Sequence, residues 1–182
     1  MNNIHLFFVF SAPPADYTLR LLVRKVIAHA AKNPDEGSDF AMATRDIRDL
    51  PDNDFLLELD QRGYECIVAL RDGKFAGFVG FQKHIDETWH SFAYHVSPEH
   101  QGNGVGKALA KAFLNAGYKA GIRYMRFYGG NVRMKLSDKN AETMAHLYHD
   151  VVLGNKLGLQ FICEAGHDIG WIKMRDRVAL SV

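Results

Sequence analysis

A glycine-rich turn between a predicted strand and a predicted helix constrains the fold of this chain most. The segment Pro98–Lys107 carries three glycines that alternate with other residues. Glycine reaches positive φ and lets the backbone approach a ligand closely. Unpaired N–H groups in the first turn of a helix, helped by the helix dipole, favour a bound anion. The segment therefore predicts a phosphate-binding turn, with Gln101 and Lys107 as further donors. A glycine-rich turn without a ligand is the alternative.

Hydrophobic periodicity places this turn within a series of strands and helices. Apolar runs predict strands over residues 3–10, 64–70, 74–82, 88–96, 122–128, 159–164 and 170–177, and helical spacing predicts helices over 17–32, 52–62, 104–120 and 141–152. Asp72-Gly73, between two of the strands, is a strong hairpin signal. The order β-α-α-β-β-β-α-β-α-β-β predicts an α+β, three-layer α/β/α arrangement with a largely central sheet. We expect a single domain over residues 1–182.

The charge balance bears on possible partners. Lys and Arg number 22 against 21 for Asp and Glu, so the formal net charge is +1. Such a balance gives no reason to expect nucleic acid or an anionic membrane as the main partner, although it leaves room for a locally basic pocket. The apolar run Ile4–Phe10 is far too short to span a bilayer, and no Lys or Arg precedes it. We expect a buried first strand there, in a soluble, cytoplasmic protein.

Cysteine and histidine spacing gives little sign of disulfide or metal chemistry. Cys66 and Cys163 lie far apart in apolar stretches, which favours buried free thiols in a reducing compartment over a disulfide. The chain has no CxxC or HExxH motif. His146 and His149 are three residues apart, which is a weak metal signal on its own. The sequence therefore predicts no metal site.

The glycine turn fails two common nucleotide motifs but fits a third pattern. A P-loop requires Gly at position 101 and Ser or Thr at position 108, where the chain has Gln and Ala. A dinucleotide fingerprint starting at Gly102 requires another Gly at position 107, which is Lys. The pattern Gln101-x-x-Gly104-x-Gly106 instead resembles the acetyl-CoA signature of the GNAT family of N-acetyltransferases. The flanking residues VSPEHQGNGVGKAL and the order of elements extend this resemblance over nearly the whole chain.

The resemblance implies a donor, a fold and an activity. The fold is a mixed, mostly antiparallel central sheet in which the strand before the turn splays from the next strand, residues 122–128, so that an acetyl thioester enters the gap. Backbone amides of the turn would wrap the pyrophosphate of acetyl-CoA, and the end of the preceding strand would bond the pantetheine. The residues assigned to acetyl-CoA are Tyr94, Val96, Gln101, Gly102, Asn103, Gly104, Val105, Gly106, Lys107 and Asn140. The implied activity is acetyl transfer to a primary amine of a small molecule or a protein.

The resemblance also implies a catalytic base. Attack by an amine needs a neutral nucleophile, a stabilised oxyanion and a proton for the departing thiolate. His90 lies six residues before Val96, where some family members carry Glu or His, and the ordinary pKa of about 6.5 suits a base near neutral pH. Glu87 and His95 are rivals, and His95 has the opposite strand parity to His90. A backbone amide near Val96 is the implied oxyanion donor. The alternative for His90 is a partly exposed strand residue without a catalytic role.

Tyr148 is the candidate general acid. The segment Asn140–Tyr148 resembles the end of the family's CoA-side helix, in which a tyrosine hydroxyl points at the thioester sulfur. The chain departs from that pattern, because Asn140 stands one residue further away and a longer stretch follows Tyr148 before Gly158. The alternative is a tyrosine that packs in the core of an amphipathic helix.

The acceptor is the part of the function that the sequence describes least. The segment 34–54 is rich in acids that could attract a cationic amine or form a solvated loop face: Asp35, Glu36, Asp39, Asp46, Asp49, Asp52 and Asp54. Basic residues of Gly129–Lys139 could instead meet the 3′-phosphate of CoA or an acidic substrate. Two other functions stay open: a catalytically silent domain that binds acyl-CoA, and a ligand-free interaction domain that forms a homodimer through its C-terminal strands.

Overall fold

A seven-stranded mixed sheet separates two layers of helices. The computed structural model describes residues 3–33, 39–83, 88–122, 124–128, 160–163 and 169–173. The strands are β1 (Ile4–Phe8), β2 (Tyr64–Arg71), β3 (Lys74–Lys83), β4 (Thr88–Val96), β5 (Tyr124–Tyr128), β6 (Gln160–Cys163) and β7 (Ile169–Lys173). Their order in the sheet is β1-β2-β3-β4-β5-β7-β6. Strands β4 and β5 run parallel, and the other neighbouring pairs are antiparallel. The predicted mixed, mostly antiparallel sheet is therefore confirmed.

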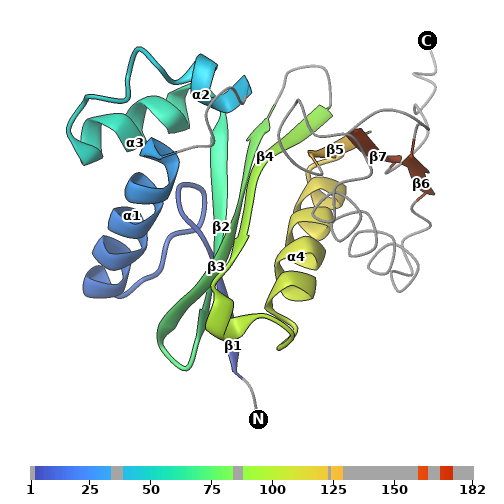
Figure 1. Cartoon of the computed structure of the whole chain (residues 1–182), viewed down its shortest axis with the longest axis horizontal. Coiled ribbons are helices and arrows are strands. Elements are labelled where there is room, and N and C mark those ends of the chain that lie inside the picture. The colour runs from blue at the N-terminus through green and yellow to red at the C-terminus, as the bar shows by residue number, and fades with distance from the viewer. Residues whose placement is uncertain are drawn as a thin grey trace.

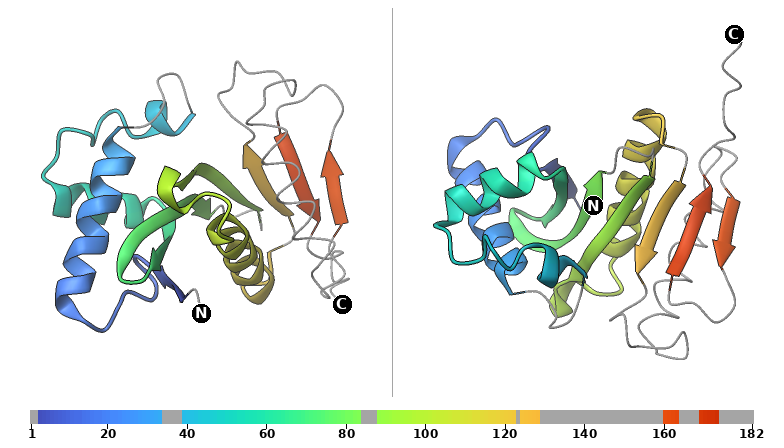
Figure 2. Two further views of the ribbon diagram at one scale, coloured as in Figure 1. Left: turned by 60° about the horizontal axis from the view of Figure 1, so that its bottom comes forward. Right: turned by 90° about the horizontal axis from the view of Figure 1, so that it is seen from above.

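Helices cover both faces of the sheet, as the predicted three-layer arrangement requires. They are α1 (Tyr17–Lys32), α2 (Asp39–Ala43), α3 (Asp52–Gln61) and α4 (Val105–Lys119), with a 3₁₀ helix η1 (Pro98–His100) shortly before α4. Figure 1 shows α1, α2 and α3 on one side of strands β2 to β4 and α4 on the other. We call these sides the α1–α3 face and the α4 face. Figure 2 shows β5, β7 and β6 continuing the sheet beyond β4.

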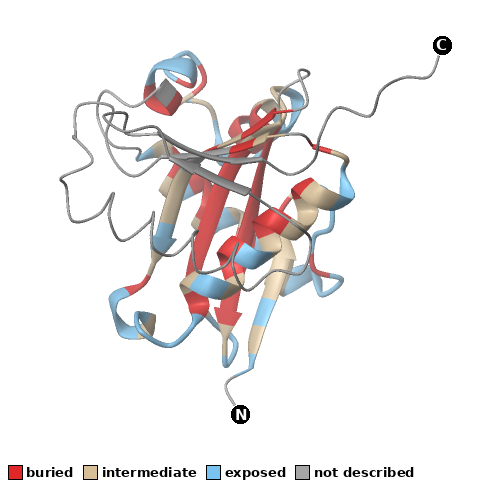
Figure 3. Ribbon diagram, turned by 90° about the vertical axis from the view of Figure 1, so that its right-hand side faces the viewer, coloured by how far each residue is buried: buried red, intermediate tan, exposed pale blue. Residues whose placement is uncertain are grey.

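Each face of the sheet carries its own apolar core. The core of the α4 face includes Ile67, Phe81, Trp89, Leu109 and Phe113. The core of the α1–α3 face includes Val23, Ile27, Phe55, Val68 and Phe78. Strand β2 supplies alternate residues to the two cores, so every residue from Tyr64 to Leu70 is buried. Figure 3 shows the buried central strands in red. A strand covered on both faces explains the nearly unbroken apolar run in its sequence.

Local sequence signals account for the start of α1 and for the β2–β3 hairpin. The carboxylate of Asp16 accepts a hydrogen bond from the Leu19 amide at 2.7 Å and so caps α1. Asp72 and Gly73 have φ of 51° and 74°, the positive values that a two-residue type I′ turn requires. Arg71 pairs with Lys74 across this turn. The Asp-Gly signal therefore predicted the hairpin correctly.

Helix α2 differs from the sequence prediction, which placed no helix in the acid-rich segment. Five residues are too few to show helical periodicity, so tertiary contacts must decide the conformation. Phe40 is buried with its ring edge-on to Tyr64, centroids 5.3 Å apart. The Thr44 hydroxyl donates to the Phe40 carbonyl at 2.8 Å. The helix predicted over residues 141–152 lies outside the described residues.

Two further expectations concern residues that the structure describes. Cys66 is a buried free thiol, and burial raises its pKa. The first predicted strand is present as β1, but at one edge of the sheet it is only partly buried, so the expectation of a buried strand is wrong. None of the helices in the described ranges combines the length and the hydropathy needed to cross a bilayer.

Candidate active site

Strands β4 and β5 pair at their beginnings and then separate. The parallel pairing joins residues 88–90 of β4 to residues 124–126 of β5 and ends at His90 and Arg126. From there β4 continues along β3 to Val96, and β5 continues along β7 to Tyr128. Both strands thus extend beyond their common pairing. This is the divergence that the sequence resemblance implied.

A bulge in β4 lies at the point of divergence. Gly80 of β3 pairs with Ala93, whereas Phe81 pairs with Ser91. Phe92 is therefore an extra residue of β4 with no register partner on β3. A bulge bends the strand and increases its twist. Because this bend follows His90 by two residues, it accounts for the separation of β4 from β5.

The bulge also changes which side chains of β4 share a face. Trp89 lies in the core of the α4 face, so His90 faces the α1–α3 side. Beyond the bulge, Tyr94 packs on the α4 face. His95 contacts Phe78 on the α1–α3 face, with ring centroids 6.2 Å apart. His90 and His95 therefore share a face. The predicted opposite parity is wrong, because it assumed an unbroken alternation along the strand.

The glycine turn has the backbone conformation that its sequence predicted. Gly102 and Gly104 have φ of 71° and 82°, and Gly104 is the N-cap of α4. The Ala108 amide donates to the Gly104 carbonyl at 3.0 Å and begins the helical hydrogen bonding. The amides of residues 105–107 therefore point out of the N-terminal end of α4. The helix dipole makes this end favourable for an anion.

Two side chains connect the turn to the end of β4. The side-chain amide of Gln101 donates to the Val96 carbonyl at 3.2 Å. The Tyr94 hydroxyl donates to the carbonyl of Gly106, in the first turn of α4. Burial raises the pKa of Tyr94, and the hydroxyl is the donor in this contact. Sequence reasoning assigned only the backbone of Tyr94 to the site and did not anticipate this side-chain contact.

Backbone groups at the end of β4 point toward the gap. The Ser97 amide donates to the Ala76 carbonyl at 3.0 Å, on the β3 side. Alternate residues of an antiparallel strand bond the same neighbour. The N–H and C=O groups of Tyr94 and Val96 are therefore directed to the other edge of β4, toward β5. These are the backbone groups that the resemblance assigned to pantetheine.

His90 lies where the gap begins. It is half-buried, between Gln82 of β3 and Arg126 of β5. Its side chain faces the α1–α3 side, whereas the glycine turn leads into α4 on the opposite side. The other predicted catalytic and CoA residues of the chain, Glu87, Tyr148 and Asn140, lie outside the described residues. Within the described ranges, no group of three or more His, Cys, Asp and Glu residues is placed to hold a metal ion.

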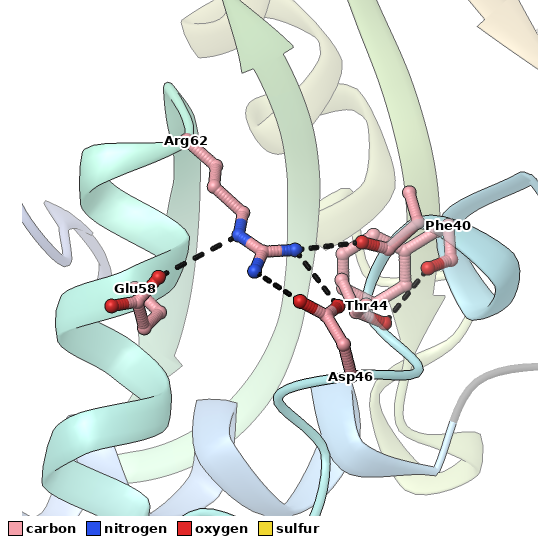
Figure 4. Close-up of polar contacts among 6 residues, drawn as sticks. Phe40, Thr44, Asp46, Glu58 and Arg62 are labelled. Atoms are coloured by element: carbon pink, nitrogen blue, oxygen red, sulfur yellow. Dashed lines mark hydrogen bonds and ion pairs between the residues drawn. The ribbon is translucent and has the colours of Figure 1, made fainter.

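Two of the acids between residues 34 and 54 form ion pairs with other elements. Arg62 contacts both carboxylate oxygens of Asp46, at 2.6 and 3.0 Å, and donates to the Ala43 carbonyl at 2.9 Å (Figure 4). The hydrogen bond from Arg62 lowers the pKa of Asp46. Lys32 of α1 donates to Asp52 at 2.9 Å. For these two acids the structure favours a role in holding the α2–α3 segment over a role in attracting a substrate.

Glu65 is a buried carboxylate that sequence reasoning did not single out. It accepts hydrogen bonds from the amides of Phe10, Ser11 and Cys66 at 3.0, 2.9 and 2.9 Å. The Lys83 ammonium lies 3.6 Å away. Glu65 thus joins the chain after β1 to strand β2. The available signal was an acid inside the apolar run YECIVAL, because acids are almost never fully buried without partners.

Known proteins resemble this chain in sequence pattern and in fold. A model of the acetyltransferase (GNAT) family matches residues 35–135. No curated protein sequence matches the chain. The structure of Tetrahymena GCN5 is similar with a TM-score of 0.54 at 13% identity, covering 94% of this chain and 96% of that one.

Two similar structures contain coenzyme A or its acetyl form. The PaiA N-acetyltransferase of Thermoplasma acidophilum, in complex with coenzyme A, gives a TM-score of 0.54 at 13% identity over 94% of this chain and 99% of that one. The yncA protein of Salmonella typhimurium, with its cofactor acetyl-CoA, gives 0.55 at 16% identity over 97% and 96%. At these identities the likeness is one of fold, and it extends over nearly all of both chains.

Proposed function

Because the chain belongs to the acetyltransferase (GNAT) family, we propose that it is an acetyl-CoA-dependent N-acetyltransferase that acts on a primary amine. The observation that carries this proposal is the glycine turn at the N-terminus of α4, directly after the strand that diverges from β5. The matched residues 35–135 include both features. Coenzyme A and acetyl-CoA in two structures of similar fold support the choice of donor.

The turn suits the pyrophosphate of acetyl-CoA. The amides of residues 105–107 and the α4 dipole favour a negative charge there. A Cβ added at Gly102 or Gly104 would meet no atom within 4 Å. The outer side of the turn therefore has room for a bulky anion close to the backbone. The pantetheine would continue along the β4 edge, past the backbone groups of Val96 and Tyr94, into the gap between β4 and β5.

In this arrangement, a few groups of the protein share the proton transfers and the charge stabilisation that acetyl transfer needs. The amine nitrogen attacks the thioester carbonyl carbon, so a C–N bond forms as the C–S bond breaks. His90 takes the proton from the amine, directly or through a water. A backbone amide near Val96 donates to the carbonyl oxygen as negative charge develops on it. Tyr148 supplies the proton that the departing sulfur takes up, and CoA leaves as the free thiol.

The position of His90 supports its role as the base. It is the last β4 residue paired with β5 and stands two residues before the bulge, so it lies at the closed end of the gap. His95 follows five residues later on the same face, next to the last residue of β4. At about 3.3 Å per strand residue the two imidazoles are roughly 15 Å apart. One thioester cannot lie beside both, and the closed end of the gap favours His90.

Isothermal titration with acetyl-CoA tests the donor, and a screen of amines that follows release of free CoA tests the reaction. We expect saturable one-to-one binding and CoA release with at least one primary amine. Binding of acetyl-CoA without turnover of any amine would instead indicate a silent acyl-CoA-binding domain. No binding at millimolar acetyl-CoA would reject both and favour a ligand-free interaction domain. If Tyr148→Phe leaves turnover intact, the general acid assignment is wrong.

A further inference from the structure

The Tyr94 side chain connects the two elements that form the donor side of the site. Its backbone belongs to β4, and its half-buried ring packs against the core of the α4 face. Its hydroxyl donates to the carbonyl of Gly106 in α4. The backbone amide of Ala110, one turn later in α4, in turn hydrogen-bonds the Tyr94 hydroxyl oxygen. The Tyr94 hydroxyl therefore contacts backbone groups of two successive turns of α4.

The turn between these elements has exposed side-chain contacts, among them the Asn103 side-chain amide, which donates to the Gln101 carbonyl at 3.1 Å. Residues 101–104 are exposed, and Gly104 offers no side chain to cap the helix. Gly102 and Gly104 both adopt left-handed conformations, which glycine leaves as easily as it enters. The Gln101 contact with Val96 lies on the exposed surface. The Tyr94 hydroxyl is part-buried, where a hydrogen bond is stronger because water competes less.

We infer that Tyr94 is a positioning residue: its hydroxyl holds the first turn of α4 against β4 and so fixes the amides of residues 105–107 toward the pyrophosphate of acetyl-CoA. This inference rests on the proposed function, which supplies the ligand. Preformed donors bind an anion more tightly than mobile ones, because less ordering is required on binding. A sequence with Leu or Phe at position 94 would fill the same core space without this restraint.

Tyr94→Phe is the direct test, because it keeps the ring and removes only the hydroxyl. Isothermal titration with acetyl-CoA should show a dissociation constant about three- to tenfold higher than in wild type, since one hydrogen bond contributes about 0.5–1.5 kcal/mol. Tyr118→Phe is the matched control. Tyr118 is a half-buried tyrosine of α4 that packs on the same core, three turns from Gly106. Its variant should bind acetyl-CoA as wild type does.

Amide hydrogen exchange gives a second readout that a general loss of stability would not reproduce. We expect residues 105–108 to exchange faster in Tyr94→Phe and unchanged in Tyr118→Phe, with both proteins folded. Equal dissociation constants for wild type and Tyr94→Phe would overturn the inference and leave the proposed function standing. The same loss of affinity in both variants would also overturn it. Absence of acetyl-CoA binding to the wild type would reject the proposed function itself.

Discussion

At the scale of single residues, two glycines with left-handed backbone conformations can be compared. A side chain at either should cost stability, but only one of them lies at the proposed acetyl-CoA site. Gly104 and Gly73 have φ of 82° and 74°, and an added Cβ at either position meets no atom within 4 Å. The cost of a side chain is therefore conformational at both, about 1–2 kcal/mol for an L-residue in the left-handed region. Gly104 caps α4 beside the proposed pyrophosphate site. Gly73 lies in the β2–β3 hairpin, outside the glycine turn.

We expect Gly104→Ala and Gly73→Ala to lower the free energy of unfolding by similar amounts in urea titrations. Only Gly104→Ala should weaken acetyl-CoA binding, by about fivefold or more, because the backbone must leave the conformation that aims the helix amides. Isothermal titration of both variants measures this difference. An equal loss of affinity in Gly73→Ala would show that the effect comes from stability and not from the turn.

At the scale of elements, buried and exposed charges join segments with different strength. Glu65 is completely buried and accepts three backbone amides, so it secures the chain after β1 to β2. Glu58 is partly exposed, 3.7 Å from Arg62. When a buried carboxylate is replaced by a neutral group, its amide donors lose their charged acceptor and water cannot take its place. When an exposed carboxylate is replaced, water hydrogen-bonds its former partner instead.

Glu65→Gln should therefore destabilise the fold by about 2–4 kcal/mol, because its side-chain NH₂ would face backbone donors and the Lys83 partner would be lost. Glu58→Gln, the control, should change stability by no more than about 0.5 kcal/mol. Urea titration at neutral pH measures both. Comparable stabilities of the two variants would mean that the Glu65 contacts do not hold β1 to β2.

The contact between Arg62 and Asp46 gives the α2–α3 segment a dependence on pH. Arg62 lowers the pKa of Asp46 from its ordinary value of 3.8. The contact therefore stabilises the fold above that value, and this contribution is lost as the pH falls through the lowered pKa. Asp46→Asn should reduce the urea midpoint at pH 7, and its difference from wild type should be smaller at pH 3, below the ordinary pKa of 3.8. In an Arg62→Met background the same substitution should have no effect at either pH. A persistent difference in that background would contradict the pairing.

Elements with local signals could be predicted, and those fixed by distant contacts could not. Asp72-Gly73 predicted its hairpin, and the spacing of Gly102 and Gly104 predicted a left-handed turn before α4, because each signal lies within a few residues. The bulge at Phe92 could not be predicted: β4 is covered on both faces, so its alternation of apolar and polar residues is weak. The face of His95 was wrong for that reason. The Tyr94–Gly106 contact depends on how α4 packs against β4, which no local pattern describes.

At the scale of the whole molecule, the two faces of the sheet have different parts in the proposed reaction. The glycine turn and α4 belong to one face, and the His90 side chain points to the α1–α3 face on the other side. In the proposed reaction the two sides would meet where β4 and β5 stop pairing, beyond His90 and Arg126. A donor that enters from the α4 side would present its thioester at the closed end of the gap, where an amine from the α1–α3 side could reach it. This division predicts that donor binding and amine activation can be lost separately.

Substitution of the two histidines of β4 tests that division. His90→Gln should lower kcat about 10²–10⁴-fold, the range for a general base, and leave the dissociation constant of acetyl-CoA unchanged. His95→Gln should alter neither, because His95 is exposed against the rings of Phe75 and Phe78, about 15 Å further along the strand. Release of CoA in the presence of a confirmed acceptor measures kcat, and isothermal titration measures binding. A large loss of kcat in His95→Gln with normal turnover in His90→Gln would move the base to the open end of the gap, and the amine would then have to approach from beside the glycine turn.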